Sequence, residues 1–108
     1  MERRITTYGG YFEAFMATLD EKTQYKVKQG LLLLATQPRL SVKYVKSLKN
    51  GLYELRIMWD GNIYRIFFIF DKGNIVVLFN GFQKKTQKTP ESEIRKALKI
   101  KEDYENRR

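Results

Sequence analysis

The sequence predicts an α+β domain in which helices pack on one face of a small, largely antiparallel sheet. Three observations lead to this fold class. Apolar residues at helical spacing fill the first third of the chain, strand-like alternation fills residues 51–82, and a helix with clear start signals follows. A length of 108 residues fits a single domain, 1–108, with one core.

The first third begins with RRITTY (residues 3–8), which alternates weakly and predicts a short strand that ends at a glycine pair. Apolar residues at helical spacing then predict a helix over 11–19. Asp20 is the expected N-cap of a second helix that runs to about Thr36. Because the two helices are joined so tightly, we expect a helical hairpin.

The middle of the chain changes its apolar period from that of a helix to that of a strand. In GLYELRIMW, Glu54, Arg56 and Met58 alternate with an apolar set. The next two segments, NIYRIFFIF and IVVLFNGF, are rich in β-branched and aromatic residues, and each follows a turn signal. The three predicted strands are 51–59, 62–70 and 75–82.

The closing helix has three start signals in a row. Thr89 is the expected N-cap, Pro90 is the first helical residue, and Glu91 lies in the first turn, where the helix dipole favours negative charge. An apolar stripe runs from Ile94 to Tyr104. The element order predicts that the helices cover one face of the sheet and leave the other free for chemistry.

Lysine and arginine outnumber the acidic residues by 21 to 12, which gives a formal net charge of +9. This excess favours polyanionic partners, with RNA and DNA ahead of an anionic membrane. The alternative is a basic protein whose charge only keeps it dispersed. The N-terminus lacks the apolar region of a secretion signal, and no apolar run reaches membrane-spanning length. We therefore expect a cytoplasmic protein with no membrane partner.

The chain contains no cysteine and no histidine. The absence of cysteine excludes disulfides, thiolate zinc sites and cysteine nucleophiles. The absence of histidine excludes a histidine general base, and a transition-metal site would need carboxylates alone. We expect no metal and no cofactor.

A group of charged residues is expected on the free face of the sheet. Glu54 and Arg56 share that face by strand alternation. Arg65 is expected beside Arg56, because a guanidinium buried under the helices without a partner would be costly. The last strand brings Lys84 and Lys85 just past its end, at the rim of the same surface. Alternatively, the lysines form a solvated turn and Arg56 pairs with Glu54 or a helix acid.

Such a cationic surface fits a phosphate with its flanking bases. Arginine binds phosphate oxygens in a fork, lysine adds a mobile charge, and the interleaved ring of Phe67 would stack on an unpaired base. Lys88 adds another ammonium group, and no acid separates it from Lys84. Lys43 and Lys46 belong to the basic segment RLSVKYVKSLKN. This segment is either a second phosphate-contacting strip or the polar cover of an irregular strand.

Three segments carry a family likeness: GLYELRI, NIYRIFFIFD and VVLFNGFQKKTQKTPESEIRKALKIKEDY. They resemble the RelE/HigB-type toxins of bacterial type II toxin–antitoxin systems, nearest to the phage-derived HigB-like branch. The most specific signal is the run G-F-x-K-K-T-x-K-T-P before a closing helix. The likeness covers most of the chain.

The resemblance implies a RelE/ParE-like fold, with the sheet packed on an N-terminal helical hairpin and a C-terminal helix. It also implies a metal-independent endoribonuclease that cleaves mRNA on the ribosome and contacts ribosomal RNA. The implied partner is a cognate helix-turn-helix antitoxin. The matching catalytic positions are Arg56, Arg65, Lys84 and Lys85. The substrate-binding candidates are Lys88, Tyr64, Phe67, Glu54, Lys43 and Lys46.

In this chemistry the ribose 2′-OH attacks the adjacent phosphorus, and arginines stabilise the charge that develops. Arg56 and Arg65 are the candidates for that role. Lys84 or Lys85 is the expected proton-transfer group, because neighbouring like charges lower the pKa of an ammonium group. Glu54 either acts as a base or orients Arg56.

Several relatives use a histidine or a C-terminal tyrosine as acid or base. This chain has no histidine, and its closing tyrosine, Tyr104, lies on the apolar stripe of the helix and is expected to be packed. We therefore expect weak activity on free RNA. Two other functions fit the same scaffold: a ParE-like toxin that acts on DNA gyrase, and a non-catalytic RNA-binding or regulatory protein.

Overall fold

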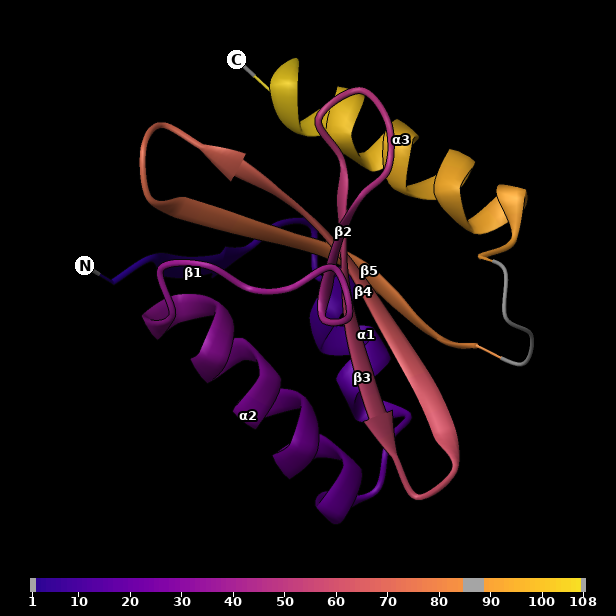
Figure 1. The fold of residues 1–108 in the computed structure, drawn as a ribbon. Coiled ribbons are helices and arrows are strands. Elements are labelled where there is room, and N and C mark those ends of the chain that lie inside the picture. Colours follow the sequence, from indigo (N-terminus) through magenta and orange to yellow (C-terminus); the bar gives the residue numbers. More distant parts are fainter. Residues whose placement is uncertain (1, 85–88, 108) are drawn as a thin grey trace.

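A five-stranded sheet with the strand order β1-β5-β4-β3-β2 forms the centre of the computed structural model, which describes residues 2–84 and 89–107 (Figure 1). The strands are β1 (Arg4–Thr7), β2 (Val45–Ser47), β3 (Tyr53–Trp59), β4 (Asn62–Asp71) and β5 (Ile75–Lys84). The helices are α1 (Tyr11–Ala17), α2 (Glu21–Thr36) and α3 (Glu91–Glu105). The α+β fold class is confirmed, and each predicted helix and strand is present.

The sheet is antiparallel except at one edge. β3, β4 and β5 form the predicted meander, and β2 adds to the outer edge of β3 in antiparallel orientation. β1 pairs in parallel with β5, from Arg4 opposite Ile75 to Thr7 opposite Leu78. β2 comes from the basic segment, for which an irregular strand was one of the two expectations.

Residue alternation on β3 and β4 places the side chains as predicted. Leu55 and Ile57 lie in the apolar cluster that packs against α1 and α2. Glu54 and Arg56 alternate with them and lie on the opposite face of the sheet. Arg56 lies directly opposite Arg65 in the β3–β4 register, which confirms the predicted direction of the Arg65 side chain.

Helices cover both faces of the sheet, so the prediction of a free face is wrong. Figure 1 shows α1 and α2 on one side of the sheet and α3 on the other. Ala97 and Ile100 of α3 are buried in a second apolar cluster with Phe67, Val77 and Phe79. The cause is that β4 and β5 are apolar on both faces, and each face must be removed from water. The charged residues therefore share their face of the sheet with α3.

The two long helices begin differently. Asp20 caps α2 as predicted, because its Oδ1 accepts a hydrogen bond from the Thr23 backbone N–H at 2.8 Å. In α3 the N-cap is Pro90 rather than the predicted Thr89, and the cap makes no side-chain hydrogen bond. The Thr89 hydroxyl is used elsewhere. Across residues 2–84 and 89–107, no helix has the length and apolar composition needed to cross a membrane.

β5 contains a bulge where it passes β4. The pairing register shifts between Ile66 and Phe68, so two residues of β5, Phe79 and Asn80, lie opposite Phe67 alone. An extra residue of this kind reverses the alternation of the strand beyond it. We call this feature the β5 bulge.

The β5 bulge decides on which face Lys84 lies. Before the bulge, the even-numbered residues Val76 and Leu78 belong to the cluster under α1 and α2. Beyond it, Phe82 packs against the cluster under α3 and lies opposite Arg65 in register. Lys84 follows two residues later and therefore lies on the α3 face, beside Arg65.

Candidate active site

The buried carboxylate of Glu54 is the centre of the charged group on the α3 face. Its Oε1 accepts a hydrogen bond from Arg65 Nη1 at 2.9 Å and lies 3.7 Å from Arg56 Nε. Its Oε2 accepts a hydrogen bond from Thr89 Oγ1 at 2.6 Å. Both oxygens are therefore occupied, and the side chain has no solvent exposure. This geometry supports orientation of the arginines rather than proton abstraction by Glu54.

Two arginine side chains lie next to each other on adjacent strands. Because Arg56 and Arg65 are directly opposite, their like charges would destabilise the strand pair without the carboxylate between them. The Nε atoms of both arginines are buried and have no hydrogen-bond acceptor among the described residues. A buried N–H donor without an acceptor is unusual. Neither donor is therefore satisfied by the protein groups that the structure describes.

Lys84 is the third cation of the group and is only 5% exposed. Burial lowers the pKa of its ammonium group, and the nearby charges of Arg65 and Arg56 lower it further. The carboxylate of Glu54 acts in the opposite direction. Burial likewise lowers the pKa of Arg65. Lys84 therefore gives up its proton more readily than an ordinary surface lysine.

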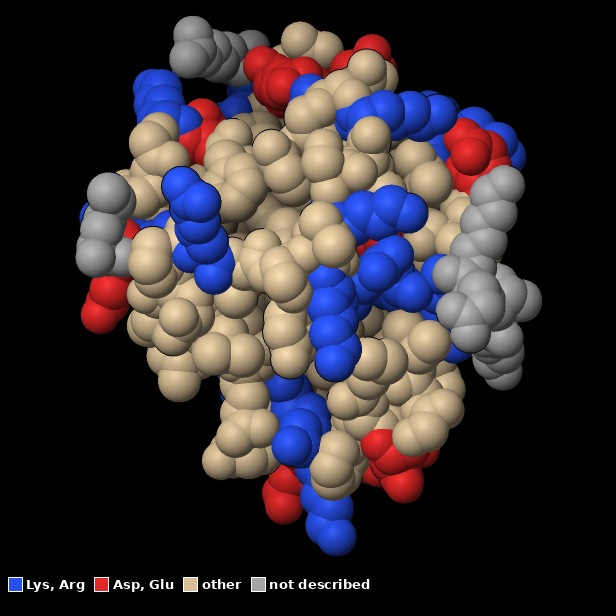
Figure 2. Space-filling view, viewed as in Figure 1, with Lys and Arg blue, Asp and Glu red and all other residues tan. Residues whose placement is uncertain are grey.

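Lys46 and Arg56 are the two cations of the group whose side chains reach the solvent. Lys46 of β2 lies opposite Glu54 in register and is exposed, and the Arg56 side chain is 27% exposed. We define the cation cluster as Arg56, Arg65, Lys84 and Lys46 around Glu54. In Figure 2, blue side chains surround a small red area near the middle of the view. The cluster is thus partly buried but reachable from one side.

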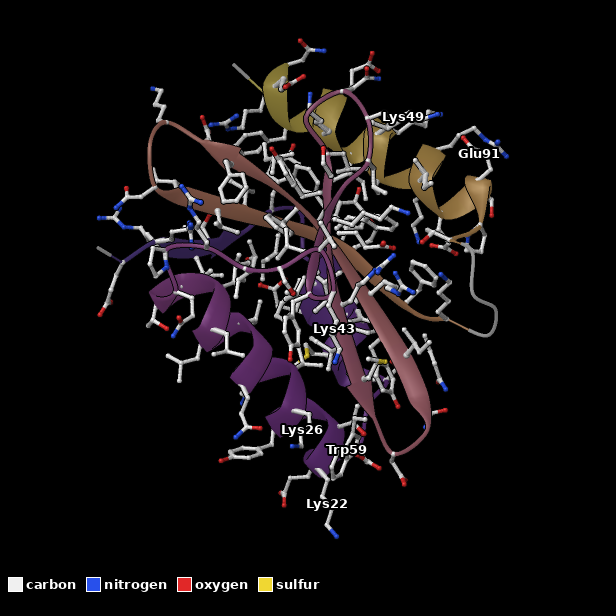
Figure 3. The ribbon with its side chains drawn as sticks, viewed as in Figure 1. Lys22, Lys26, Lys43, Lys49, Trp59 and Glu91 are labelled. Carbon is white, nitrogen blue, oxygen red and sulfur yellow. The ribbon has the colours of Figure 1, made fainter. Side chains whose placement is uncertain are left out.

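The basic segment before β3 divides into two parts. The loop that carries Lys43 touches Arg56, whose backbone N–H and Nη1 donate to the carbonyls of Tyr44 and Val42 at 2.7 and 3.4 Å. Lys49 instead lies beside the start of α3 and pairs with Glu91 at 3.1 Å (Figure 3). Lys46 is therefore the cation of this segment that belongs to the cluster, and Lys43 lies in the loop that contacts Arg56.

Several residues named from the sequence lie elsewhere. Tyr64 is buried on the opposite face, in the cluster under α1 and α2, so it cannot contact a ligand of the cation cluster. Phe67 is fully buried and stacks on Phe82 with the ring centroids 5.7 Å apart, so the predicted stacking of Phe67 on a base is wrong. Lys85 and Lys88 lie outside the described residues.

Sequence reasoning missed the role of Thr89. The residue was assigned to the helix cap, yet its hydroxyl holds Glu54 from 35 positions away in the chain. Tyr104 is packed as expected: its ring contacts Tyr8 and Phe79, and its hydroxyl donates to Asp71. Tyr104 lies 13 positions after Glu91, the first residue of α3, which corresponds to roughly 20 Å along the helix from the end that follows Thr89.

The cation cluster is suited to bind and stabilise a phosphate group. Arginine donors and a lysine ammonium are the groups that match phosphate oxygens. Low exposure strengthens their interaction with an anion, because less water screens the charges. In the described part of the chain, no three acidic side chains are grouped so that they could hold a metal ion.

Comparison with known proteins gives the family. A search of the curated proteins finds no match to the chain. The family model described as phage-derived protein Gp49-like (DUF891) matches residues 14–102, which include each described member of the cation cluster. The chain therefore belongs to the Gp49-like phage-derived family, a type II toxin family related to the RelE/HigB-like toxins.

Proposed function

We propose that the protein is an endoribonuclease toxin of the HigB-like branch that cleaves mRNA on the ribosome and so inhibits translation. One observation carries the proposal: two arginines on adjacent strands share one buried carboxylate, and each keeps a buried Nε–H without an acceptor among the described residues. Membership in a type II toxin family related to the RelE/HigB-like toxins supports this proposal. The net charge of +9 supports a polyanionic substrate.

In the proposed mechanism, the 2′-oxygen forms a bond to the adjacent phosphorus and the bond to the 5′-oxygen breaks. The products are a 2′,3′-cyclic phosphate and a free 5′-hydroxyl. Arg56 and Arg65 stabilise the extra negative charge on the phosphoryl oxygens. Lys84, whose pKa is lowered, donates its proton to the 5′-oxygen. Lys85 is the candidate that takes the proton of the 2′-hydroxyl.

Arg56 offers the cleanest test of this mechanism. Arg56→Ala leaves the buried Arg65–Glu54 pair in place, so we expect folding to be kept while mRNA cleavage falls by about 100-fold or more. Arg95→Ala removes the same charge from an exposed position on α3 and is the matched control. Loss of RNA affinity in the variant, with no cleavage by the wild type or the variant, would favour a non-catalytic RNA-binding protein instead.

The low exposure of the site supports the proposed dependence on the ribosome. Arg65 and Lys84 are 4% and 5% exposed, so a flexible RNA must be held in one conformation to present its phosphate. Purified protein should therefore cut messages on programmed ribosomes much faster than naked message. Equal cutting of both would contradict this part of the proposal.

Mapping of message 5′ ends after controlled expression tests the function in cells. New ends that depend on Arg56 support the nuclease. DNA damage with intact messages would identify a gyrase poison instead. We also propose a helix-turn-helix antitoxin as partner, and restored growth upon co-expression of the adjacent reading frame is the expected result.

A further inference from the structure

A groove runs along the part of β5 that β1 does not cover. β1 pairs with β5 only as far as Leu78, and the remaining edge of β5 lies between α1 and α3. The space measures about 490 Å³, within the range of small-molecule sites. Its principal lining residues are Tyr11, Thr18, Asn80, Phe82, Gln83 and Lys96. We call this space the β5-edge groove.

Asn80 lies in the wall of the groove with an unsatisfied amide. The residue is 3% exposed, and neither its Oδ1 nor its Nδ2 has a hydrogen-bond partner among the described residues. Buried polar side chains in folded proteins nearly always have partners, so this amide needs an explanation. An apolar residue of similar size at this position would make the folded state more stable. Asn80 therefore has the character of a ligand-binding residue.

The β5 bulge directs Asn80 to this position. Asn80 is one of the two residues that lie opposite Phe67, and bulges re-aim side chains next to functional sites. Two residues further on, Phe82 lines the groove and also lies opposite Arg65 of the cation cluster. The groove and the cluster are therefore neighbours along the same strand.

Spacing along β5 matches a nucleotide next to a bound phosphate. From Lys84 to Asn80 the strand advances by roughly 13 Å, which one or two unstacked nucleotides can span. Tyr11 is 37% exposed and offers its ring for stacking on a base. Lys96 adds a positive charge at the rim for the backbone.

We propose that the β5-edge groove is a nucleobase pocket in which the Asn80 amide reads an adenine next to the cleaved phosphate. An asparagine amide pairs with the neighbouring donor and acceptor of adenine, accepting from N6–H and donating to N7. This inference rests on the proposed function and adds a base preference to it. Because a nucleoside carries no phosphate, its binding can be measured without cleavage.

NMR titration of the full-length protein with the four nucleosides tests the pocket. Adenosine should shift the side-chain amide signal of Asn80 at roughly tenfold lower concentration than the other three. Equal shifts with all four nucleosides, or none with any, would overturn the inference. A shift produced only by an antitoxin peptide would assign the groove to a protein partner and would overturn it too.

Asn80→Leu separates a ligand-binding role from a structural one. The variant should keep or gain thermal stability, because it removes a buried amide that has no partner, and it should lose adenosine binding by roughly tenfold or more. Asn74→Leu, six positions earlier in the turn before β5 where the amide donates to the Glu2 carbonyl, is the control that should keep adenosine binding. A marked loss of stability in Asn80→Leu would show that the amide is structural and would refute the pocket.

The two proposals can fail separately. Adenosine binding at Asn80 without any mRNA cleavage would keep the pocket and remove the nuclease. Cleavage on ribosomes with no preference for adenine, together with unchanged cleavage by Asn80→Leu, would keep the nuclease and remove the pocket.

Discussion

Arg65 of β4 donates from Nη1 to Glu54 Oε1 of β3 at 2.9 Å, and the two side chains are 4% and 0% exposed. The pair joins neighbouring strands inside the site itself. A buried ion pair is costly to form, because both charges lose their water, and it is costlier still to break from one side. The structure and the proposed chemistry therefore depend on the same carboxylate.

Glu54→Gln tests this dependence. The substitution keeps the shape of the side chain but leaves a buried guanidinium without its counter-charge, so the free energy of unfolding should fall by about 3 kcal/mol. Urea denaturation measures the change. Glu105→Gln removes the acid of the Lys101–Glu105 pair, in which the Glu105 side chain is 53% exposed, and should cost roughly 0.5 kcal/mol or less. Similar losses in both variants would contradict the central role of Glu54.

Lys84→Met should change how stability depends on pH. Between the lowered pKa of Lys84 in the folded protein and its ordinary value of 10.5, the unfolded chain holds a proton that the folded protein does not. The free energy of unfolding therefore rises with pH in this window on account of Lys84. Denaturation at several alkaline pH values should show a smaller rise in Lys84→Met than in the wild type. An unchanged slope would mean that Lys84 titrates normally.

The same pKa predicts the pH dependence of cleavage. If the Lys84 ammonium donates the proton to the 5′-oxygen, cleavage on ribosomes should fall as the pH rises through the lowered pKa. Lys84→Arg holds its proton at a much higher pH and should be inactive across the range. Rates that increase throughout the alkaline range would instead indicate that Lys84 acts as a base.

Gly81→Ala tests the close contact of α1 with β5. A Cβ at this position would lie 2.6 Å from Phe15 Cδ2, so one of the two elements must move. We expect a loss of about 1–3 kcal/mol in the free energy of unfolding. Phe15→Leu in the same chain should recover part of it, whereas two simply additive losses would show that this contact is not the cause.

Tyr104→Phe distinguishes packing from catalysis. The variant loses the hydroxyl group that donates to Asp71, and we expect it to be less stable by about 1 kcal/mol with unchanged cleavage. The hydrogen bond to Asp71 raises the pKa of Tyr104, so the folded protein should form this phenolate only above the ordinary range. Ultraviolet titration of wild type and variant measures the difference. A strong loss of cleavage would place Tyr104 in the reaction.

Local rules in the sequence predicted much of the fold. The Asp20 cap could be predicted because it requires only a carboxylate three residues before an N–H that has no partner within the helix. The faces of the strands could be predicted because successive residues of a strand point to opposite faces. The position of Arg65 followed from alternation together with the cost of burying its charge. Coverage of both faces of the sheet could also have been predicted. In NIYRIFFIF both the odd-numbered and the even-numbered residues are mainly apolar, whereas the residues of a solvent-facing side would be polar.

The remaining features depend on contacts between distant parts of the chain. Thr89 reaches Glu54 across 35 positions, and no local pattern distinguishes this use of its hydroxyl from a helix cap. The parallel pairing of β1 with β5 joins segments about 70 positions apart. The β5 bulge has one local signal in IVVLFNGF, the glycine at position 81, and the apolar residues on both faces do not show where the alternation reverses. Plain alternation would therefore place Lys84 on the wrong side of the sheet.

The β5 bulge has a consequence for how relatives of this chain can differ in length. Loss of the single codon for Asn80 would remove the extra residue, yet Lys84 would stay opposite Ile63 on the α3 face, because the strand pairs on both sides of Phe67 are unchanged. Relatives that are one residue shorter at this point should therefore keep the cation cluster and lack only the amide of the β5-edge groove.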